Sequence, residues 1–176
     1  MATSGISILT RRELDAGRRF SLWVSLLVPA VAILLQCYVP LRLHAFTYLD
    51  LPLLVTIFFA VARRNPLAGT VTGMVIGVVQ DAISGLPIGI NGIADTVVGY
   101  IGSSLSLKLE IEQPGPRILM IFGFKFLHDA VYFLIQSRIV GSELMYRSRW
   151  EVYSALANAI VGVFLMHQLD KLKKRS

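Results

Sequence analysis

The chain has 176 residues, enough for one domain of ordinary size. Hydrophobic residues make up 55% of it and charged residues 16%, with a mean hydropathy of +0.64, whereas a soluble domain carries about 25% charged residues. The formal net charge is +6, but the basic residues separate apolar runs, which argues against a nucleic-acid partner and indicates a protein that crosses a membrane several times. The single cysteine, Cys37, excludes an internal disulfide and any multi-cysteine metal site.

The apolar runs predict an all-α polytopic membrane protein. A cytoplasmic segment over residues 1–19, either a tether or a short interfacial helix, precedes a transmembrane domain over 20–170. The expected spans are 20–41, 45–62, 66–83, 91–107, 117–137 and 151–169, and a basic cytoplasmic tail, 171–176, follows. The first span is the clearest, since 22 residues carry no charge and about 20 cross a bilayer. The second, third and fourth are short enough that each could instead be re-entrant or buried.

Two asparagines are placed to start helices. Asn65 precedes Pro66, which combines an N-cap acceptor with a proline in the first helical turn. Asn91 follows a segment rich in Gly and Pro, residues 84–90, and we expect it to cap the fourth helix.

The distribution of Lys and Arg predicts that both termini lie inside the cell. Cytoplasmic segments carry the excess of basic residues, and six spans with an inner N-terminus place twelve inside and four outside, with Lys125 within a span. The inner set is Arg11, Arg12, Arg18, Arg19, Arg63, Arg64, Lys108, Arg117, Lys171, Lys173, Lys174 and Arg175, and the outer set is Arg42, Arg138, Arg147 and Arg149.

Small residues recur every four positions in the third and fourth spans. Residues four apart lie on one face of a helix, and in lipid a face of small residues lets a second helix approach closely. The expected helix-packing residues are Gly69, Gly73, Gly77, Gly99 and Ser103. Such a face serves packing within this bundle or, alternatively, docking to another protein.

Ionisable residues within the spans predict a polar pocket. A charge at mid-membrane costs about 2.5 to 3.5 kcal/mol and usually faces a bundle interior or a water-filled cavity. Lys125 and Asp129 share a helix face, whereas the neighbours His128 and Asp129 point about 100° apart and are not expected to pair. With Asp81 and Asp95 near the outer ends of their spans, we infer a pocket open to the outer side and walled by the third, fourth and fifth spans.

Two further acids, Asp50 and Glu151, are expected to be ordinary residues at helix ends. No catalytic set is evident: the string nearest to the GxSG of an intramembrane serine protease is Ala82 to Gly85, which lacks the first glycine. HExxH and GxxxxGK[ST] are absent, and the three histidines are widely scattered, so we expect no enzyme activity, no metal and no cofactor.

The segment from Gly77 to Tyr100 resembles the central signature of the MreD family of bacterial membrane proteins. The matching positions are Gly77, Asp81, Gly85, Pro87, Gly89, Gly99 and Tyr100, with the Arg-Arg-Asn-Pro turn at residues 63–66. The resemblance implies a non-enzymatic, multi-pass subunit of the cell-elongation (Rod) complex in the bacterial inner membrane. The implied partners are MreC directly, RodA and a class B penicillin-binding transpeptidase, RodZ and MreB indirectly, and membrane lipid.

The resemblance also implies a fold similar to the substrate-binding (S) subunits of energy-coupling-factor (ECF) transporters, so a vitamin-binding transporter subunit is the alternative function. Our first hypothesis is a pocket that receives MreC and so supports peptidoglycan synthesis and rod shape. Its expected residues are Asp81, Pro87, Gly89, Asn91, Asp95, Lys125, His128 and Asp129.

Overall fold

The computed structural model describes residues 20–85, 87–109, 113–141 and 148–172. Its α-helices are α2 (Leu22–Tyr38), α3 (Leu51–Arg63), α4 (Pro66–Ser84), α5 (Ile90–Ser106), α6 (Pro114–Ile135) and α7 (Ser148–Asp170). Two short 3₁₀ helices, η1 (Val39–Leu41) and η2 (His44–Tyr48), join α2 to α3, and a π-helical turn, η3 (Gln136–Val140), extends α6. The predicted N-terminal segment 1–19 and most of the predicted tail lie outside the described residues.

Four helical segments are long and apolar enough to cross a membrane: Leu22–Leu41, Pro66–Ser84, Gly115–Arg138 and Glu151–Asp170. The helices α3, with 13 residues, and α5, with 17, are shorter than these. The described part of the chain is therefore an all-helical membrane protein. The assignment of six complete spans stays a prediction.

The shortest of the described α-helices, α3, forms the centre of the molecule. Eleven of its 13 residues are buried, and it contacts α2, α4, α5, α6 and α7. A helix that is apolar on all sides is stable only where other elements surround it. Asp50 and Pro52 start α3 well inside the predicted second span 45–62, because the Asp50 carboxylate caps the Leu53 N–H at 3.3 Å.

The residues at both ends of α4 form local interactions that start and stop the helix. The Asn65 side chain accepts a hydrogen bond from the Ala68 N–H at 3.1 Å, and Pro66 is the first helical residue. At the other end Gly85 has φ of 67°, and its N–H donates to the Asp81 carbonyl. A glycine stops the helix there because a side chain is strained in that conformation.

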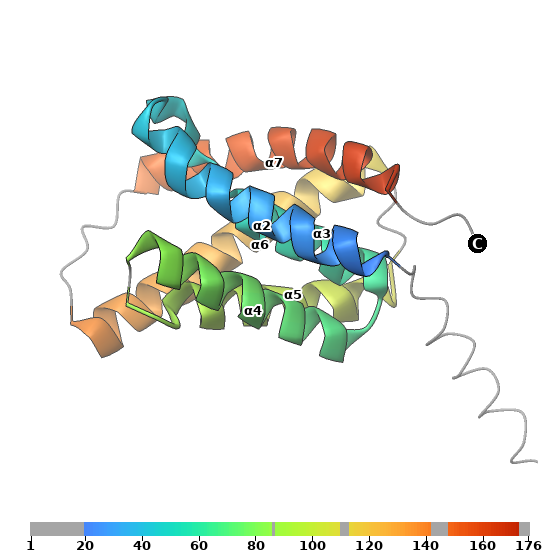
Figure 1. The fold of residues 1–176 in the computed structure, drawn as a ribbon, viewed down its shortest axis with the longest axis horizontal. Coiled ribbons are helices and arrows are strands. Elements are labelled where there is room, and N and C mark those ends of the chain that lie inside the picture. The colour runs from blue at the N-terminus through green and yellow to red at the C-terminus, as the bar shows by residue number, and fades with distance from the viewer. Residues whose placement is uncertain (1–19, 86, 110–112, 142–147, 173–176) are drawn as a thin grey trace, which may run out of the picture.

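The start of α2 and the end of α7 lie at the same end of the bundle (Figure 1). Basic residues gather at that end: Arg63, Arg64, Lys108, Arg117 and Lys171. The acids Asp50, Asp81, Asp95, Asp129 and Glu151 belong to the opposite half of their helices. The basic end also holds Asp170 and the acidic end holds Arg42 and Arg138, but each end keeps an excess of its own sign. Many large apolar side chains of α2, α4, α6 and α7 are exposed between the two ends.

Candidate functional site

The connection between α4 and α5 is organised by one buried carboxylate. Asp81 is in the last turn of α4 and is fully buried. Its Oδ2 atom accepts hydrogen bonds from the N–H groups of Gly89 at 2.8 Å and Asn91 at 3.1 Å, and its Oδ1 accepts from the Asn91 side-chain amide at 2.7 Å. Asp81 therefore caps α5 from a neighbouring helix, where the carboxylate also complements the positive end of the helix dipole.

This arrangement corrects the expected role of Asn91. The helix begins at Ile90 with Gly89 at the N-cap, and no side chain of its own caps it. Asn91 is a donor to Asp81 rather than an acceptor for its own helix. The N-cap has φ of 108°, a conformation that favours glycine, which leaves no side chain at that position to accept the free N–H groups.

A second polar cluster lies inside the bundle among α3, α5 and α6. The Lys125 ammonium group is 2.6 Å from Asp129 Oδ1 and 3.6 Å from Asp50 Oδ2. His128 adds its imidazole, with Nδ1 3.2 Å from Asp129 Oδ1 and 3.9 Å from Asp50 Oδ2. We name Asp50, Asp95, Lys125, His128 and Asp129 the charged cluster.

One expectation about these residues was incomplete and another was wrong. Asp50 lies at a helix end, as expected, where it caps α3, but it also faces Lys125. His128 and Asp129 do contact each other although they are neighbours on α6. Burial of charge is costly unless the groups are brought together, and this cost explains why both side chains turn toward the same polar interior.

Asp95 is the most isolated member of the charged cluster. It is fully buried, and neither of its carboxylate oxygens has a hydrogen-bond partner. Its ionisable neighbour is His128, whose Nε2 lies 3.6 Å from Asp95 Oδ1. The burial of Asp95 is therefore not compensated by a hydrogen bond in the described part of the chain.

The structure divides the predicted pocket into two sites. Asp81, Gly89 and Asn91 belong to the cap at the start of α5, with Pro87 exposed in the loop before it. Asp95, Lys125 and His128 are buried in the charged cluster. The helix α3, which the sequence analysis did not assign to the pocket, packs against α4, α5 and α6 and contributes Asp50 to this cluster from its N-terminal end. Within the described part of the chain, no group of three or more His, Cys, Asp or Glu could hold a metal ion.

The small residues of α4 face α5. A Cβ atom added at Gly73 would lie 2.7 Å from the backbone carbonyl carbon of Asp95, and one at Gly77 would lie 2.5 Å from the Asn91 carbonyl oxygen. A Cβ atom added at Gly69 would likewise come too close to the Gly99 carbonyl oxygen and to the Ser103 side chain. The two backbones are therefore in direct contact along this face, which serves packing inside the molecule.

Hydrogen bonds from α7 hold the chain before α3 in place. Asn158 is fully buried; its Oδ1 accepts from the Asp50 N–H at 2.8 Å, and its amide donates to the Tyr48 carbonyl at 2.8 Å. Ser154 donates to the same carbonyl. These bonds fix the backbone of Asp50 and so position its carboxylate toward Lys125.

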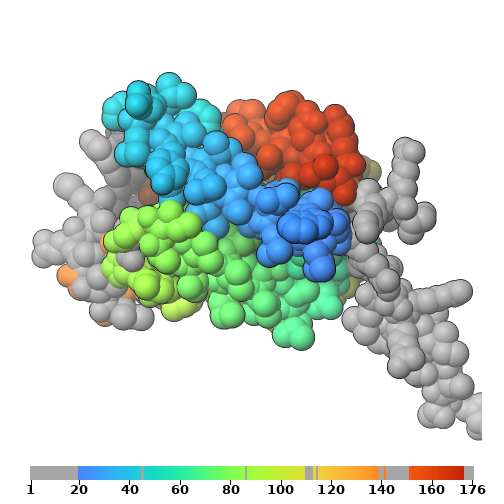
Figure 2. Space-filling model, viewed as in Figure 1, coloured from blue at the N-terminus to red at the C-terminus, as the bar shows by residue number. Residues whose placement is uncertain are grey.

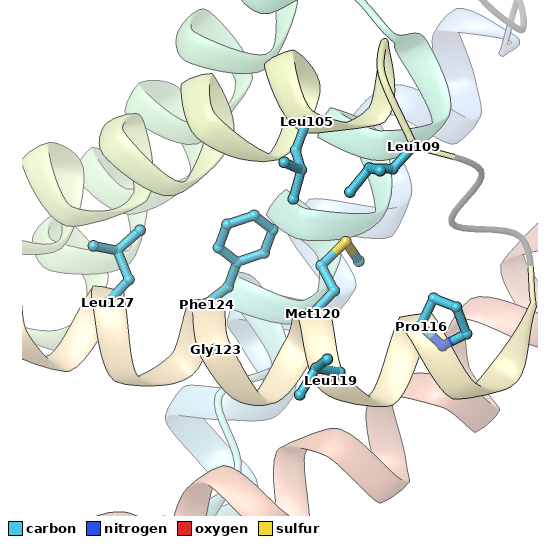
Figure 3. Close-up of a pocket in the computed structure, with 8 residues that line it drawn as sticks. All are labelled: Leu105, Leu109, Pro116, Leu119, Met120, Gly123, Phe124 and Leu127. Atoms are coloured by element: carbon cyan, nitrogen blue, oxygen red, sulfur yellow. The ribbon is translucent and has the colours of Figure 1, made fainter.

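An apolar cavity of about 570 Å³ lies between the end of α5 and the first half of α6. Figure 3 shows Leu105 and Leu109 opposite Met120 and Phe124, with Gly123 between the α6 side chains. A Cβ atom at Gly123 would meet nothing within 4 Å, so this glycine leaves space open.

The fold and these sites define a class: a helical membrane protein with a close glycine contact between two helices and a buried charged cluster. Within that class the chain belongs to the MreD family, because the family model described as rod shape-determining protein MreD matches residues 17–174. This is a family of shape-determining structural membrane proteins. Comparisons with curated proteins and with solved structures find no match.

Proposed function

We propose that this protein is a non-enzymatic scaffold subunit of the bacterial Rod complex, and that it binds MreC in the inner membrane. The family match over residues 17–174 carries the proposal. In the proposed topology, six segments of the chain cross or enter the membrane, and both termini lie inside the cell. RodA, the class B penicillin-binding transpeptidase, RodZ and MreB associate with the protein through the complex.

We place the MreC contact at the outer end of the bundle, around the α4–α5 loop and the charged cluster. The charged cluster contains three carboxylates but only one lysine and one histidine. The excess of carboxylates favours a basic or hydrogen-bond-donating segment, since complementary charge selects partner and register. The loop residues Pro87 and Ile88 are exposed, with Ile88 at 73%, and they are accessible to such a segment.

Site-specific photo-crosslinking in membranes that contain MreC from the same bacterium tests this placement. Ile88 and Leu67 are almost equally exposed, at 73% and 74%, but Leu67 lies in the first turn of α4 and Ile88 in the loop that follows the last turn. A crosslinker at position 88 is expected to capture the juxtamembrane part of MreC, and one at position 67 serves as the matched control. Equal capture from both positions would contradict the proposed surface, and absence of co-purification with MreC would contradict the function.

The transporter-subunit alternative has its own test. A small ligand that binds the folded protein raises its melting temperature, by mass action. Under the scaffold proposal, a panel of vitamins is expected to leave the melting temperature unchanged while MreC co-purifies. A saturable shift with one vitamin and no capture of MreC would favour the alternative.

A further inference from the structure

A second cavity, with a smaller volume of about 350 Å³, lies between α2 and α4, and the last residue of α3 also lines it. Its apolar walls come from Leu26, Pro29 and Ile33 of α2 and from Val71, Val75 and Val79 of α4. Figure 2 shows the blue surface of α2 and the green surface of α4 adjoining on the viewed face. We name this cavity the α2–α4 groove.

One end of the α2–α4 groove is polar. Arg63, the last residue of α3, lines it together with Ser25 and Thr72. The guanidinium donates hydrogen bonds to Ser25 Oγ at 2.9 Å and to Thr72 Oγ1 at 3.0 Å, and it lies 5.0 Å from the centre of the Phe59 ring. Two hydroxyls and an aromatic ring therefore hold the arginine head in a fixed position.

The charge of Arg63 is not neutralised within the described part of the chain, where its partners are the two hydroxyls and the ring. A guanidinium has five N–H donors, and these contacts use two of them. Arg64 follows directly, and Lys108 and Lys171 add positive charge at the same end, where Arg117 is paired with Asp170 at 2.8 Å. A half-buried cation with free donors at the end of an apolar groove is chemically complementary to an anion attached to an apolar chain.

We propose that the α2–α4 groove binds an anionic phospholipid, with one acyl chain between α2 and α4 and the phosphate on Arg63. The bundle is embedded in membrane, so the apolar walls meet acyl chains. The end of α3 lies at the basic end of the bundle, where a headgroup phosphate is expected. Arginine binds phosphate through two parallel N–H groups, and basic residues between membrane helices select anionic headgroups.

The size of the groove favours an acyl chain over a transmembrane helix. From Val71 to Val79, eight residues along α4, the groove extends about 12 Å at 1.5 Å per residue. A helix with its side chains is about 10 to 12 Å across, so a segment of this length occupies on the order of 1000 Å³. The cavity of 350 Å³ is too small to enclose such a segment, so a helix would insert only side chains there and would leave the Arg63 donors without an anion.

Native mass spectrometry of the full chain with phosphatidylglycerol and phosphatidylcholine of identical acyl chains tests the proposal. The wild type is expected to prefer phosphatidylglycerol by about tenfold, and Arg63→Gln is expected to lose most of that preference. Lys108→Gln, which removes one exposed charge at the same end of the bundle, is the matched control and should keep it. An equal affinity of the wild type for the two lipids would overturn the proposal, and so would an unchanged preference in Arg63→Gln.

A second pair of variants tests the apolar part without touching the charge. Val75→Trp fills the groove, whereas Met74→Trp, at a similarly exposed position on the same helix, does not line it. Val75→Trp is expected to lower the affinity for phosphatidylglycerol about tenfold, and Met74→Trp to leave it unchanged. This pair decides the question if Arg63→Gln fails to fold. Equal binding by both tryptophan variants, or capture of a protein helix instead of lipid by a crosslinker at position 75, would refute the site.

Discussion

At the scale of single residues, Asp81 does more than its place near a helix end suggests. It accepts hydrogen bonds from two N–H groups and one side-chain amide at the start of α5. Asp81→Ala removes these acceptors and leaves buried donors unpaired, so we expect a loss of about 1 to 3 kcal/mol in stability. Thermal unfolding in detergent measures it. Ser84→Ala, an exposed change three residues away, is the control, and equal melting temperatures for the two variants would contradict the capping role.

The buried Lys125 side chain faces two carboxylates. Its ammonium group lies close to both Asp50 and Asp129 inside the bundle. Removing one partner of a buried ion pair costs about 3 to 5 kcal/mol, because the other charges stay buried. We expect Lys125→Met to melt far below the wild type, while Lys108→Met, at an exposed position, melts close to it. A Lys125→Met variant as stable as Lys108→Met would show that the cluster is not held by this charge.

At the scale of elements, the pairing of α4 with α5 depends on the absence of a side chain at the contact. A Cβ at Gly73 would collide with the backbone of Asp95, whereas a Cβ at Gly123 would meet nothing. Gly73→Ala therefore forces the helices apart, at a cost of about 1 to 3 kcal/mol, while Gly123→Ala is expected to be neutral or slightly stabilising. Detergent melting curves compare the two. Equal destabilisation would mean that a general effect of helical glycines, and not the α4–α5 contact, is responsible.

At the scale of the whole molecule, the orientation of the bundle in the membrane can be tested by thiol labelling. We propose the basic end inside, following the excess of Lys and Arg in cytoplasmic segments. In a Cys37→Ser background, Ile88→Cys is expected to react with an impermeant maleimide added to intact cells lacking an outer-membrane barrier. Gly115→Cys, at the opposite end, should react only after permeabilisation. The reverse pattern would invert the proposed topology.

The amino-acid sequence alone predicts the helical membrane class, because a long uncharged segment in lipid must satisfy its backbone hydrogen bonds internally, as a helix does. Local chemistry also determined the start of α4, since Asn65 and Pro66 act within one turn of the chain. The four-residue spacing of Gly69, Gly73 and Gly77 predicted a close contact, but not its partner. The family followed from the signature around Asp81, which the match over residues 17–174 confirms.

The distribution of the polar residues between two sites depends on tertiary contacts. Asp81 caps α5 across a loop, and Asp50 joins Lys125 from another helix, through contacts between residues distant in sequence. No periodicity reports such contacts, since spacing along one helix says which residues share a face but not what that face meets. The burial of the short helix α3 at the centre depends on the helices packed around it. The fold placed these charges together because isolated charges inside a bundle are costly and paired ones less so.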